Sequence, residues 1–339
     1  MTRARIGQHR ALRCSRSAVA SALVVLMVAS GACGGPAARR PAAVRSAGPP
    51  SSAAASSPAR PGVKRARRFG HVFLVVMENE PFAAALADPS IARLARRYAY
   101  EANSYAAAHP SLPNYLALTG GSTFGITSDC LTCFVSAPNL AQQLQAAHLS
   151  WDGYFQSVSQ SCYLGTSYGE YAAKHNPFRY YRDVRSRRAL CSHLRPYAEL
   201  RSALEVPARR TPAFVWVTPN VCYDGHSCPL FLAGRFLTGL VREITASAAW
   251  RDGGLLLVTW DEGSGGDPRS ITPAGRVLPS GGGGHILTLV ITPRLPPGTV
   301  LGAPMSHYGL LATIEENFRL PLLAKARGWA AHSLFRFPS

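Results

Sequence analysis

Residues 69–77 read FGHVFLVVM, an almost unbroken apolar run that is rich in valine. A run of this kind is typical of a strand that is buried on both faces, as in a parallel sheet. Similar runs occur at residues 213–218 (AFVWVT), 254–260 (GLLLVTW) and 286–292 (ILTLVIT), with a shorter one at 151–155 (WDGYF). Helical patterns lie between and after them, at residues 90–98, 139–148, 193–204, 231–246 and 306–318, the last with Glu315 and Glu316 on its solvated face. The alternation predicts an α/β fold: a doubly wound, mostly parallel sheet flanked by helices.

The chain before the first strand has the composition of an exported leader. A basic start, an apolar stretch from Ala18 to Ala29 and small residues up to Cys33 predict a signal peptide over residues 1–33. Residues 30–33 (SGAC) also resemble a lipobox, which makes Cys33 a candidate lipid anchor and membrane tether, with plain secretion as the alternative.

Residues 34–68 are dominated by Ala, Pro, Ser, Gly and Arg and predict a disordered tether, so residues 69–339 form the globular domain. The formal charge of the whole chain is +18, but residues 1–70 hold 13 basic residues and no acidic ones. Residues 71–339 hold 23 basic and 18 acidic residues. The leader explains most of the excess charge, and a nucleic-acid partner is not expected.

Six cysteines lie beyond the leader, and an even number in an exported chain favours disulfides. Proximity in the sequence suggests three pairs, although it does not exclude others: Cys130 with Cys133, Cys162 with Cys191, and Cys222 with Cys228. The first pair is also a CxxC motif, for which a redox or metal-binding role is the alternative.

Residues 109–121 (HPSLPNYLALTGG) predict a tight turn that leads into a helix. Ser111 stands where an N-cap residue belongs, and capping is the commonest role of serine there. A hydroxyl at a helix N-terminus also meets free backbone N–H groups, which suit an anionic, phosphate-like group. Ser111 is therefore a candidate nucleophile, with His109 and Asn114 of the same turn as further catalytic candidates.

Polar side chains follow three of the predicted buried strands, and the carboxyl ends of parallel strands meet at one edge of a sheet. Oxygen ligands with a few imidazoles suit Zn²⁺, Mn²⁺, Mg²⁺ or Ca²⁺, and two such ions would clamp the oxygens of a phosphoryl transfer. A metal beside Ser111 would favour loss of its hydroxyl proton. The candidate ligands are Glu78, Asn79, Asp224, His226, Asp261, Glu262 and, before the fourth strand, His285.

Five motifs, in order, resemble the bacterial phosphoesterase family that includes phospholipases C and secreted acid phosphatases, a branch of the alkaline phosphatase superfamily. They are Glu78-Asn79, HPSLPNYLALTGG, PNVCYDGH, VTWDEG and SHYGLLATIEENF, and they span about residues 69–321.

The resemblance implies an alkaline phosphatase-like fold and a phosphoseryl intermediate on Ser111. It places Glu78, Asn79, Asp261 and Glu262 around one metal position. It suggests Asp224 and His226, joined by Asn220 and His285, at a second, and Asn220 is also a candidate substrate-binding residue. His307 falls in the last motif, where a structural or substrate-side role is expected.

Together these features predict an exported, monomeric phosphoesterase that hydrolyses phosphomonoesters of a small molecule or a phospholipid headgroup. A phosphodiesterase or phospholipase C on the same site is the nearest alternative, and a non-catalytic surface lipoprotein is the third. A sulfatase is disfavoured, because its maturation motif needs an arginine where this chain has Tyr115.

Overall fold

The structure is a computed structural model that describes residues 68–263 and 266–334. The predicted signal peptide, Cys33 and all of the predicted tether except Arg68 lie outside the described residues.

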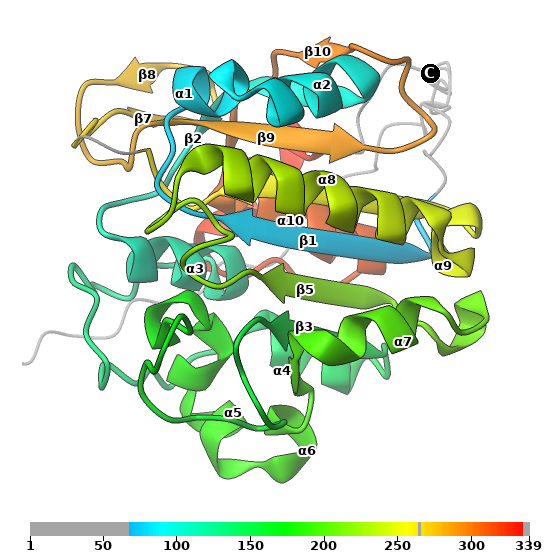
Figure 1. Cartoon of the computed structure of the whole chain (residues 1–339). Helices are drawn as coiled ribbons and strands as arrows, with labels where there is room; N and C mark the ends of the chain where they lie inside the picture. Colours follow the sequence, from blue (N-terminus) through cyan, green and yellow to red (C-terminus); the bar gives the residue numbers. More distant parts are fainter. Residues whose placement is uncertain (1–67, 264–265, 335–339) are drawn as a thin grey trace, which may run out of the picture. The chain divides into compact units, whose positions relative to one another are not determined.

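The central sheet has β1 (His71–Met77) in its interior, between β6 (Gly254–Trp260) and β5 (Phe214–Thr218), which both run parallel to it. The strand order is β10-β2-β9-β6-β1-β5-β3-β4, and β11 also pairs with β2. β9 is antiparallel to both of its neighbours, so its arrow in Figure 1 points against those of β1 and β5. The remaining bounds are β2 Ala99–Tyr105, β3 Trp151–Phe155, β4 Leu194–Pro196, β9 His285–Ile291, β10 Val300–Leu301 and β11 Met305–Ser306, while β7 Ser270–Ile271 and β8 Val277–Leu278 pair separately. The sheet is therefore mostly parallel, as predicted.

Helices cover both faces of the sheet, which explains why the sequence of β1 is almost entirely apolar. Val72, Leu74 and Val76 pack into one core, and Phe73, Val75 and Met77 into the other, because successive side chains of a strand point to opposite faces. The first core lies under α3 (Ser111–Gly120), α4 (Leu140–Ala146) and α10 (His307–Phe318). The second lies under α1 (Phe82–Ala87), α2 (Pro89–Arg97), α8 (Leu230–Ala246) and α9 (Ala248–Arg251), with α8 in front of the sheet in Figure 1.

Residues 156–212 connect β3 to β5 and hold mostly short elements. They are the 3₁₀ turns η1 (Ala173–His175), η2 (Pro177–Tyr180), η3 (Tyr197–Glu199) and η4 (Ala208–Arg210), and the helices α5 (Arg182–Ser186), α6 (Arg188–Cys191) and α7 (Leu200–Leu204). A longer 3₁₀ segment, η5 (Ala324–His332), follows α10.

Two sequence-based predictions about elements are wrong. Residues 193–204 do not form one helix, because residues 194–196 pair with β3 as strand β4, and Pro196 cannot donate a helical hydrogen bond. Glu315 does not lie on a solvated face: it is fully buried, and its Oε1 accepts a hydrogen bond from the Leu323 N–H at 3.0 Å.

The three disulfides of the described residues join the predicted pairs: Cys130–Cys133, Cys162–Cys191 and Cys222–Cys228. Among the helices of the described residues, none combines the length and the apolar character needed to cross a membrane.

Candidate active site

Three neighbouring strands bring their carboxylates together at the carboxyl edge of the sheet. Glu78 directly follows β1, Asp261 directly follows β6, and Asp224 lies in the turn after β5. All three side chains are fully buried. Backbone hydrogen bonds hold these segments in register: Glu78 N donates to Asp224 O at 3.0 Å, and Asp261 N donates to Met77 O at 2.9 Å. The structure thus gathers the carboxylates that the sequence predicts at this edge.

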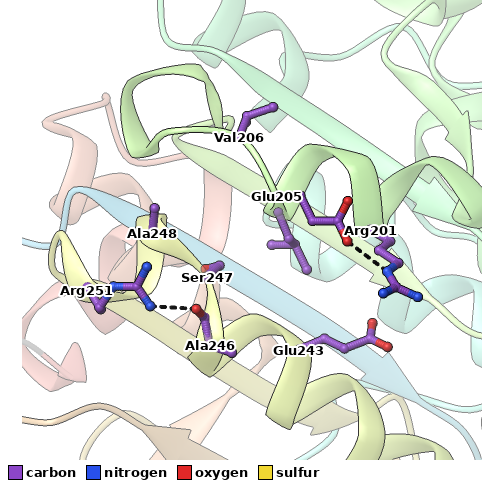
Figure 2. A pocket seen from close by; sticks show the side chains of 9 residues that line it. Arg201, Glu205, Val206, Glu243, Ala246, Ser247, Ala248 and Arg251 are labelled. Carbon is purple, nitrogen blue, oxygen red and sulfur yellow. Dashed lines mark hydrogen bonds and ion pairs between the residues drawn. The ribbon is translucent and has the colours of Figure 1, made fainter.

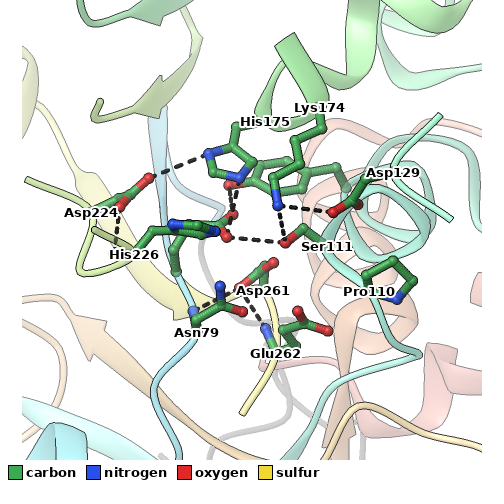
Figure 3. Close-up of polar contacts among 12 residues, drawn as sticks. Asn79, Pro110, Ser111, Asp129, Lys174, His175, Asp224, His226, Asp261 and Glu262 are labelled. Carbon is green, nitrogen blue, oxygen red and sulfur yellow. Dashed lines mark hydrogen bonds and ion pairs between the residues drawn. The ribbon is translucent and has the colours of Figure 1, made fainter. Parts of the chain in front are cut away.

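Ser111 contributes its hydroxyl to this cluster instead of capping its own helix. The N-cap of α3 is Pro110, and Ser111 is the first helical residue. Its Oγ donates to Glu78 Oε2 at 3.1 Å (Figure 3). The next backbone N–H, that of Leu112, donates to Asp129 Oδ1 at 2.9 Å. The capping interpretation of Ser111 is therefore wrong, and Asp129 satisfies the helix terminus.

Two neighbouring residues that sequence reasoning missed, Lys174 and His175, complete the site from η1. His175 lies between two carboxylates, with Nε2 3.1 Å from Glu78 Oε2 and Nδ1 3.3 Å from Asp224 Oδ2. Lys174 Nζ donates to Asp129 Oδ2 at 2.8 Å and to Ser111 Oγ at 3.4 Å (Figure 3). An ammonium group thus stands beside the candidate nucleophile.

Burial and mutual charge shift the titration of the cluster. Burial raises the pKa of Asp261 well above its ordinary value, and the charges of Glu78 and Glu262 raise it further. Burial also acts on Glu78, but His175 and the hydroxyl of Tyr115, which donates to Glu78 Oε1 at 2.5 Å, outweigh it and lower the pKa to about 2. Burial opposes protonation of His175, yet its two carboxylate partners raise its pKa to about 9. Such a concentration of buried negative charge favours a bound cation.

The donor atoms fit a divalent metal ion. One ligand atom from each of Glu78, His175 and Asp224 lies within 4.8 Å of the others. Asp261 Oδ2 is buried without a hydrogen-bond partner, and Asp224 Oδ2 has His175 Nδ1 as its neighbour at 3.3 Å. Carboxylates with an imidazole suit Zn²⁺, Mn²⁺, Mg²⁺ or Ca²⁺. The set is therefore a candidate site for a divalent ion.

A hollow of about 440 Å³ lies beside the cluster and is lined by Asn79, Glu80, His109, Gly225, His226, Glu262, Gly263 and Gly266. His109 Nδ1 is 2.5 Å from Glu262 Oε2, and this hydrogen bond raises the pKa of the imidazole. The ring of His226 lies 5.8 Å from that of His175, centroid to centroid, and burial lowers the pKa of His226. The hollow gives a substrate room beside the carboxylates.

Asn79 has a backbone conformation that suits its place at the edge of this hollow. Its φ of 51° lies in the left-handed region, which asparagine tolerates better than most residues. Its backbone N–H donates to Asp261 Oδ1 at 3.0 Å, so Asn79 helps to orient that carboxylate.

Two predicted residues lie in the supporting structure of the Ser111 turn. The amide of Asn114 bonds both the N–H and the carbonyl of Ala108, at 2.9 and 2.7 Å. His307 Nε2 donates to Trp260 O at 3.0 Å, and its Nδ1 accepts from Ala107 N at 3.4 Å. Burial lowers the pKa of His307 to about 4, which keeps the ring neutral. Both side chains position the turn instead of facing Ser111.

Asn220 and His285 make their contacts outside the cluster. The Asn220 side chain accepts from the N–H groups of Cys222 and Tyr223 and so shapes the turn that carries Asp224. The ring of His285 stacks between Phe82 and Tyr105, with centroids at 4.3 and 4.9 Å. Its Nε2 donates to Ala102 O at 2.9 Å. Because β9 is antiparallel, His285 does begin at the carboxylate edge, yet its ring is held among aromatic side chains.

A separate hollow of about 370 Å³ lies among α7, α8 and α9 (Figure 2). Arg201 pairs with Glu205 at 2.9 Å, and Arg251 donates to Ala246 O at 2.7 Å. This hollow lies near the amino end of β6, away from the carboxylates.

The buried carboxylates, the serine at a helix start and the α/β sheet define a hydrolase of phosphate esters. The chain belongs to the Phosphoesterase family, whose model matches residues 84–321. It is 31% identical over 261 residues to a phosphatidylinositol-3-phosphatase of Mycobacterium tuberculosis, with 75% of this chain and 78% of that protein covered. It is 27% identical over 267 residues to a phosphate-repressible acid phosphatase of Penicillium chrysogenum, with 76% and 60% covered. The chain spans about three fifths of that fungal relative.

Solved structures confirm the fold. A protein in the alkaline phosphatase superfamily from Vibrio parahaemolyticus superposes with a TM-score of 0.51 at 12% identity, covering 75% of this chain and 67% of that one. The C-terminal periplasmic domain of EcEptC from Escherichia coli, solved as a complex with Zn, gives 0.50 at 10% identity, covering 81% and 89%. The predicted alkaline phosphatase-like architecture is therefore correct.

Proposed function

We propose that this chain is an exported phosphatase that hydrolyses phosphomonoesters through a phosphoseryl intermediate on Ser111. One observation carries the proposal. Ser111 is the first residue of α3, and its hydroxyl donates to the buried carboxylate of Glu78 and lies 3.4 Å from the ammonium group of Lys174. In the first step Ser111 Oγ attacks phosphorus, its proton is lost, and the bond to the ester oxygen breaks, so that the leaving group takes up a proton. In the second step water attacks the phosphoserine and releases phosphate and Ser111.

The residues best suited to hold a divalent ion are Glu78, His175 and Asp224, whose ligand atoms lie close together, and Asp261, whose Oδ2 has no hydrogen-bond partner. Asn79, His226 and Glu262 are further candidate ligands from the sequence. A bound ion supplies positive charge beside the serine oxygen and the phosphoryl oxygens. Tyr115 and His175 fix the orientation of Glu78, which accepts the hydrogen bond of the nucleophile. His109, held by Glu262, lines the hollow in which the leaving group can lie.

Lys174 favours a monoester over a diester substrate. A phosphomonoester has a third non-bridging oxygen and an additional negative charge, which need a cationic or donating partner. Lys174 Nζ is near Ser111 Oγ and is oriented by Asp129. A diesterase needs an apolar wall at the same place. The phosphodiesterase or phospholipase C alternative is thus less well supported by this site.

The compartment and the substrate follow from other features of the chain. Three disulfides fit an oxidising environment, and residues 1–33 have the pattern of a signal peptide. Cys33 is the candidate site of a membrane tether. The relatives are named for phosphatidylinositol-3-phosphate and for acid phosphatase activity, so a phosphorylated small molecule or a phospholipid headgroup is the proposed substrate.

The test compares hydrolysis of p-nitrophenyl phosphate and bis-p-nitrophenyl phosphate by the wild type and by Ser111→Ala, each with and without EDTA. We expect turnover of the monoester, which the Ser111→Ala variant loses by about 10³-fold or more while remaining folded by circular dichroism. Preferred turnover of the diester would support the phospholipase alternative. A folded, metal-supplemented wild type that hydrolyses neither compound would favour the non-catalytic lipoprotein.

A further inference from the structure

Three arginines surround one phenylalanine on the surface beyond β3. The guanidinium carbons of Arg179, Arg182 and Arg185 lie 5.9, 5.8 and 4.0 Å from the centre of the Phe134 ring. We call these three residues the arginine cluster. Backbone hydrogen bonds join the segment that carries Phe134 to the segment that carries the arginines: Val135 N donates to Tyr180 O at 2.8 Å, and Arg182 N donates to Val135 O at 2.9 Å.

The arginine cluster has no acidic counterpart. Among the described residues, no carboxylate lies within 4.0 Å of any of its guanidinium nitrogens. Asp183, its neighbour in sequence, is engaged by the Asn139 amide at 3.1 Å and by Arg187 at 3.7 Å. Arg179 donates to the carbonyls of Leu131 and Leu164, and Arg185 donates to those of Leu164 and Arg179. Carbonyl groups satisfy donors, but they leave the net positive charge in place.

Burial makes this uncompensated charge costly. Arg179 is only 2% exposed, and its Nε is buried without a hydrogen-bond partner. Burial and the charges of Arg179 and Arg182 also lower the pKa of Arg185. A buried charge is expected to be paired, and three like charges around one ring repel one another. Such an arrangement is stabilised when an anion binds, and the planar guanidinium groups suit a phosphate.

The arginine cluster is linked to the catalytic serine through one short loop. Leu131 and Phe134 both contact Arg179; Leu131 lies between the two cysteines of the Cys130–Cys133 disulfide, and Phe134 directly follows it. Asp129 precedes that disulfide and bonds both the N-terminus of α3 and Lys174. The loop from 129 to 134 therefore contacts the candidate active site at one end and the arginine cluster at the other.

We propose that the arginine cluster is a second oxyanion site, distinct from the Ser111 site, that binds a phosphate group. The phosphate comes either from a free phosphorylated molecule or from the headgroup of a phospholipid. Arg182 is exposed and Arg185 is half-buried, so both are accessible to a ligand. Arg179 is buried and contributes its positive charge without being accessible itself.

Arginine footprinting tests this site by a readout that does not depend on catalysis. The full chain is treated with phenylglyoxal in chloride and in inorganic phosphate at equal ionic strength, and modified peptides are mapped by mass spectrometry. We expect phosphate to slow modification of Arg182 and Arg185 by about 5-fold or more relative to Arg209 and Arg210, an exposed pair without a carboxylate partner. Equal slowing, or none, at both pairs would overturn the proposal.

A second arm distinguishes the source of the phosphate. Vesicles of phosphatidylcholine with and without phosphatidic acid are sedimented with the wild type, R182Q/R185Q and the charge-matched control R209Q/R210Q. If the ligand is a lipid headgroup, R182Q/R185Q binds the anionic vesicles about 30-fold more weakly than the control does. If protection by phosphate occurs without this loss, the ligand is a free phosphorylated molecule. R182Q/R185Q should hydrolyse p-nitrophenyl phosphate within about 2-fold of the wild type, since neither arginine touches the Ser111 site.

Discussion

Ser111 is set apart from an ordinary helix-capping serine by the residues that surround it. Pro110 takes the N-cap position and has no polar side chain to offer. Asp129 accepts from the Leu112 N–H, so the helix terminus is satisfied from outside the turn. The Ser111 hydroxyl is thereby left to donate to Glu78. A serine whose hydroxyl is not needed for capping is available for chemistry.

The role of Lys174 is tested by Lys174→Met, which removes the charge and keeps most of the stem. We expect kcat/KM for p-nitrophenyl phosphate to fall about 100-fold, because one preorganised donor to the phosphoryl oxygens is lost. Hydrolysis of bis-p-nitrophenyl phosphate should fall much less, since a diester lacks the third non-bridging oxygen. Steady-state kinetics on both compounds measure the ratio. Lys325→Met, an exposed lysine on η5, is the matched control, and an equal loss on both substrates would contradict the assignment.

Sequence reasoning found the acidic candidate ligands but missed the two basic residues of the site, Lys174 and His175, for a physical reason. Glu78 and Asp261 follow apolar strands, where a polar residue marks a strand end. Lys174 and His175 belong to a short 3₁₀ turn inside residues 156–212. No regular apolar pattern in that segment predicts where its residues lie relative to the sheet. The sequence KHNP at residues 174–177 was the available signal, a cationic pair before a turn, but its position at the sheet edge depends on tertiary structure.

At the scale of elements, α10 connects the active-site edge with the core. Its first residue, His307, joins the end of β6 to the loop before Ser111. Near its other end, Glu315 Oε1 accepts from Leu323 N, while Oε2 is buried without a partner. The helix is buried on nearly every side. The prediction that Glu315 lies on a solvated face assumed an amphipathic helix and was therefore wrong. A helix under η5 has no solvated face for that position.

Glu315 gives a pH-dependent prediction. Burial raises its pKa from the ordinary 4.5 to about 8. Ionisation of Glu315 is therefore less favourable in the folded chain than in the unfolded chain, and it lowers the stability of the fold. This loss of stability is absent below about pH 4.5, grows as the pH rises and is complete above about pH 8. Glu315→Gln keeps the acceptor for Leu323 and cannot ionise. We expect its free energy of unfolding, relative to the wild type, to increase by about 3–5 kcal/mol between pH 5 and pH 8.

Urea unfolding at a series of pH values measures this difference. Glu243→Gln, an exposed carboxylate on α8, is the control and should show a nearly constant difference from the wild type. A pH-independent effect of Glu315→Gln would mean that the carboxylate is already ionised at no cost in the folded protein.

The other strands differ in how well the sequence predicts them, because only some of the buried strands have an apolar sequence. β1, β5, β6 and β9 are mostly apolar, and their positions were predicted closely. β2 (AYEANSY) was not predicted, because it contains Glu101, Asn103 and Ser104 and has an irregular register between residues 101 and 104. Glu101 is nevertheless fully buried and accepts from Asn103 N. The pairing of β2 with β9 on one side and with β10 and β11 on the other makes this polar segment a strand.

At the scale of the whole molecule, the sheet concentrates buried negative charge where β6, β1 and β5 end. Without a cation, this charge is balanced by His175 and by protons on groups such as Asp261, whose pKa is strongly raised. The fold therefore has an electrostatic cost at this edge of the sheet, which a bound divalent ion would offset. Ion binding should consequently stabilise the entire domain, because the ligands come from separate strands.

Thermal unfolding measures that coupling. Adding Zn²⁺, Mn²⁺, Mg²⁺ or Ca²⁺ to EDTA-treated protein should raise Tm by about 5 °C at roughly 100 times the dissociation constant of the preferred ion. Asp261→Asn should raise Tm of the metal-free protein, because the amide is neutral without taking up a proton on folding. It should reduce the shift caused by the ion, because it removes a carboxylate from the cluster. Asp183→Asn, outside the cluster, should leave the shift unchanged. The absence of a shift with all four ions would show that the carboxylates do not form a metal site.

The central claim is that Ser111 carries the phosphoryl group between the two half-reactions. The direct measurement is rapid acid quenching during turnover of p-nitrophenyl phosphate, followed by peptide mapping with mass spectrometry. We expect one phosphoryl group on the peptide that contains Ser111, transient in the wild type and absent from Ser111→Ala. Steady turnover with no phosphorylated Ser111 at any quench time, or with the phosphoryl group on another residue, would contradict the account.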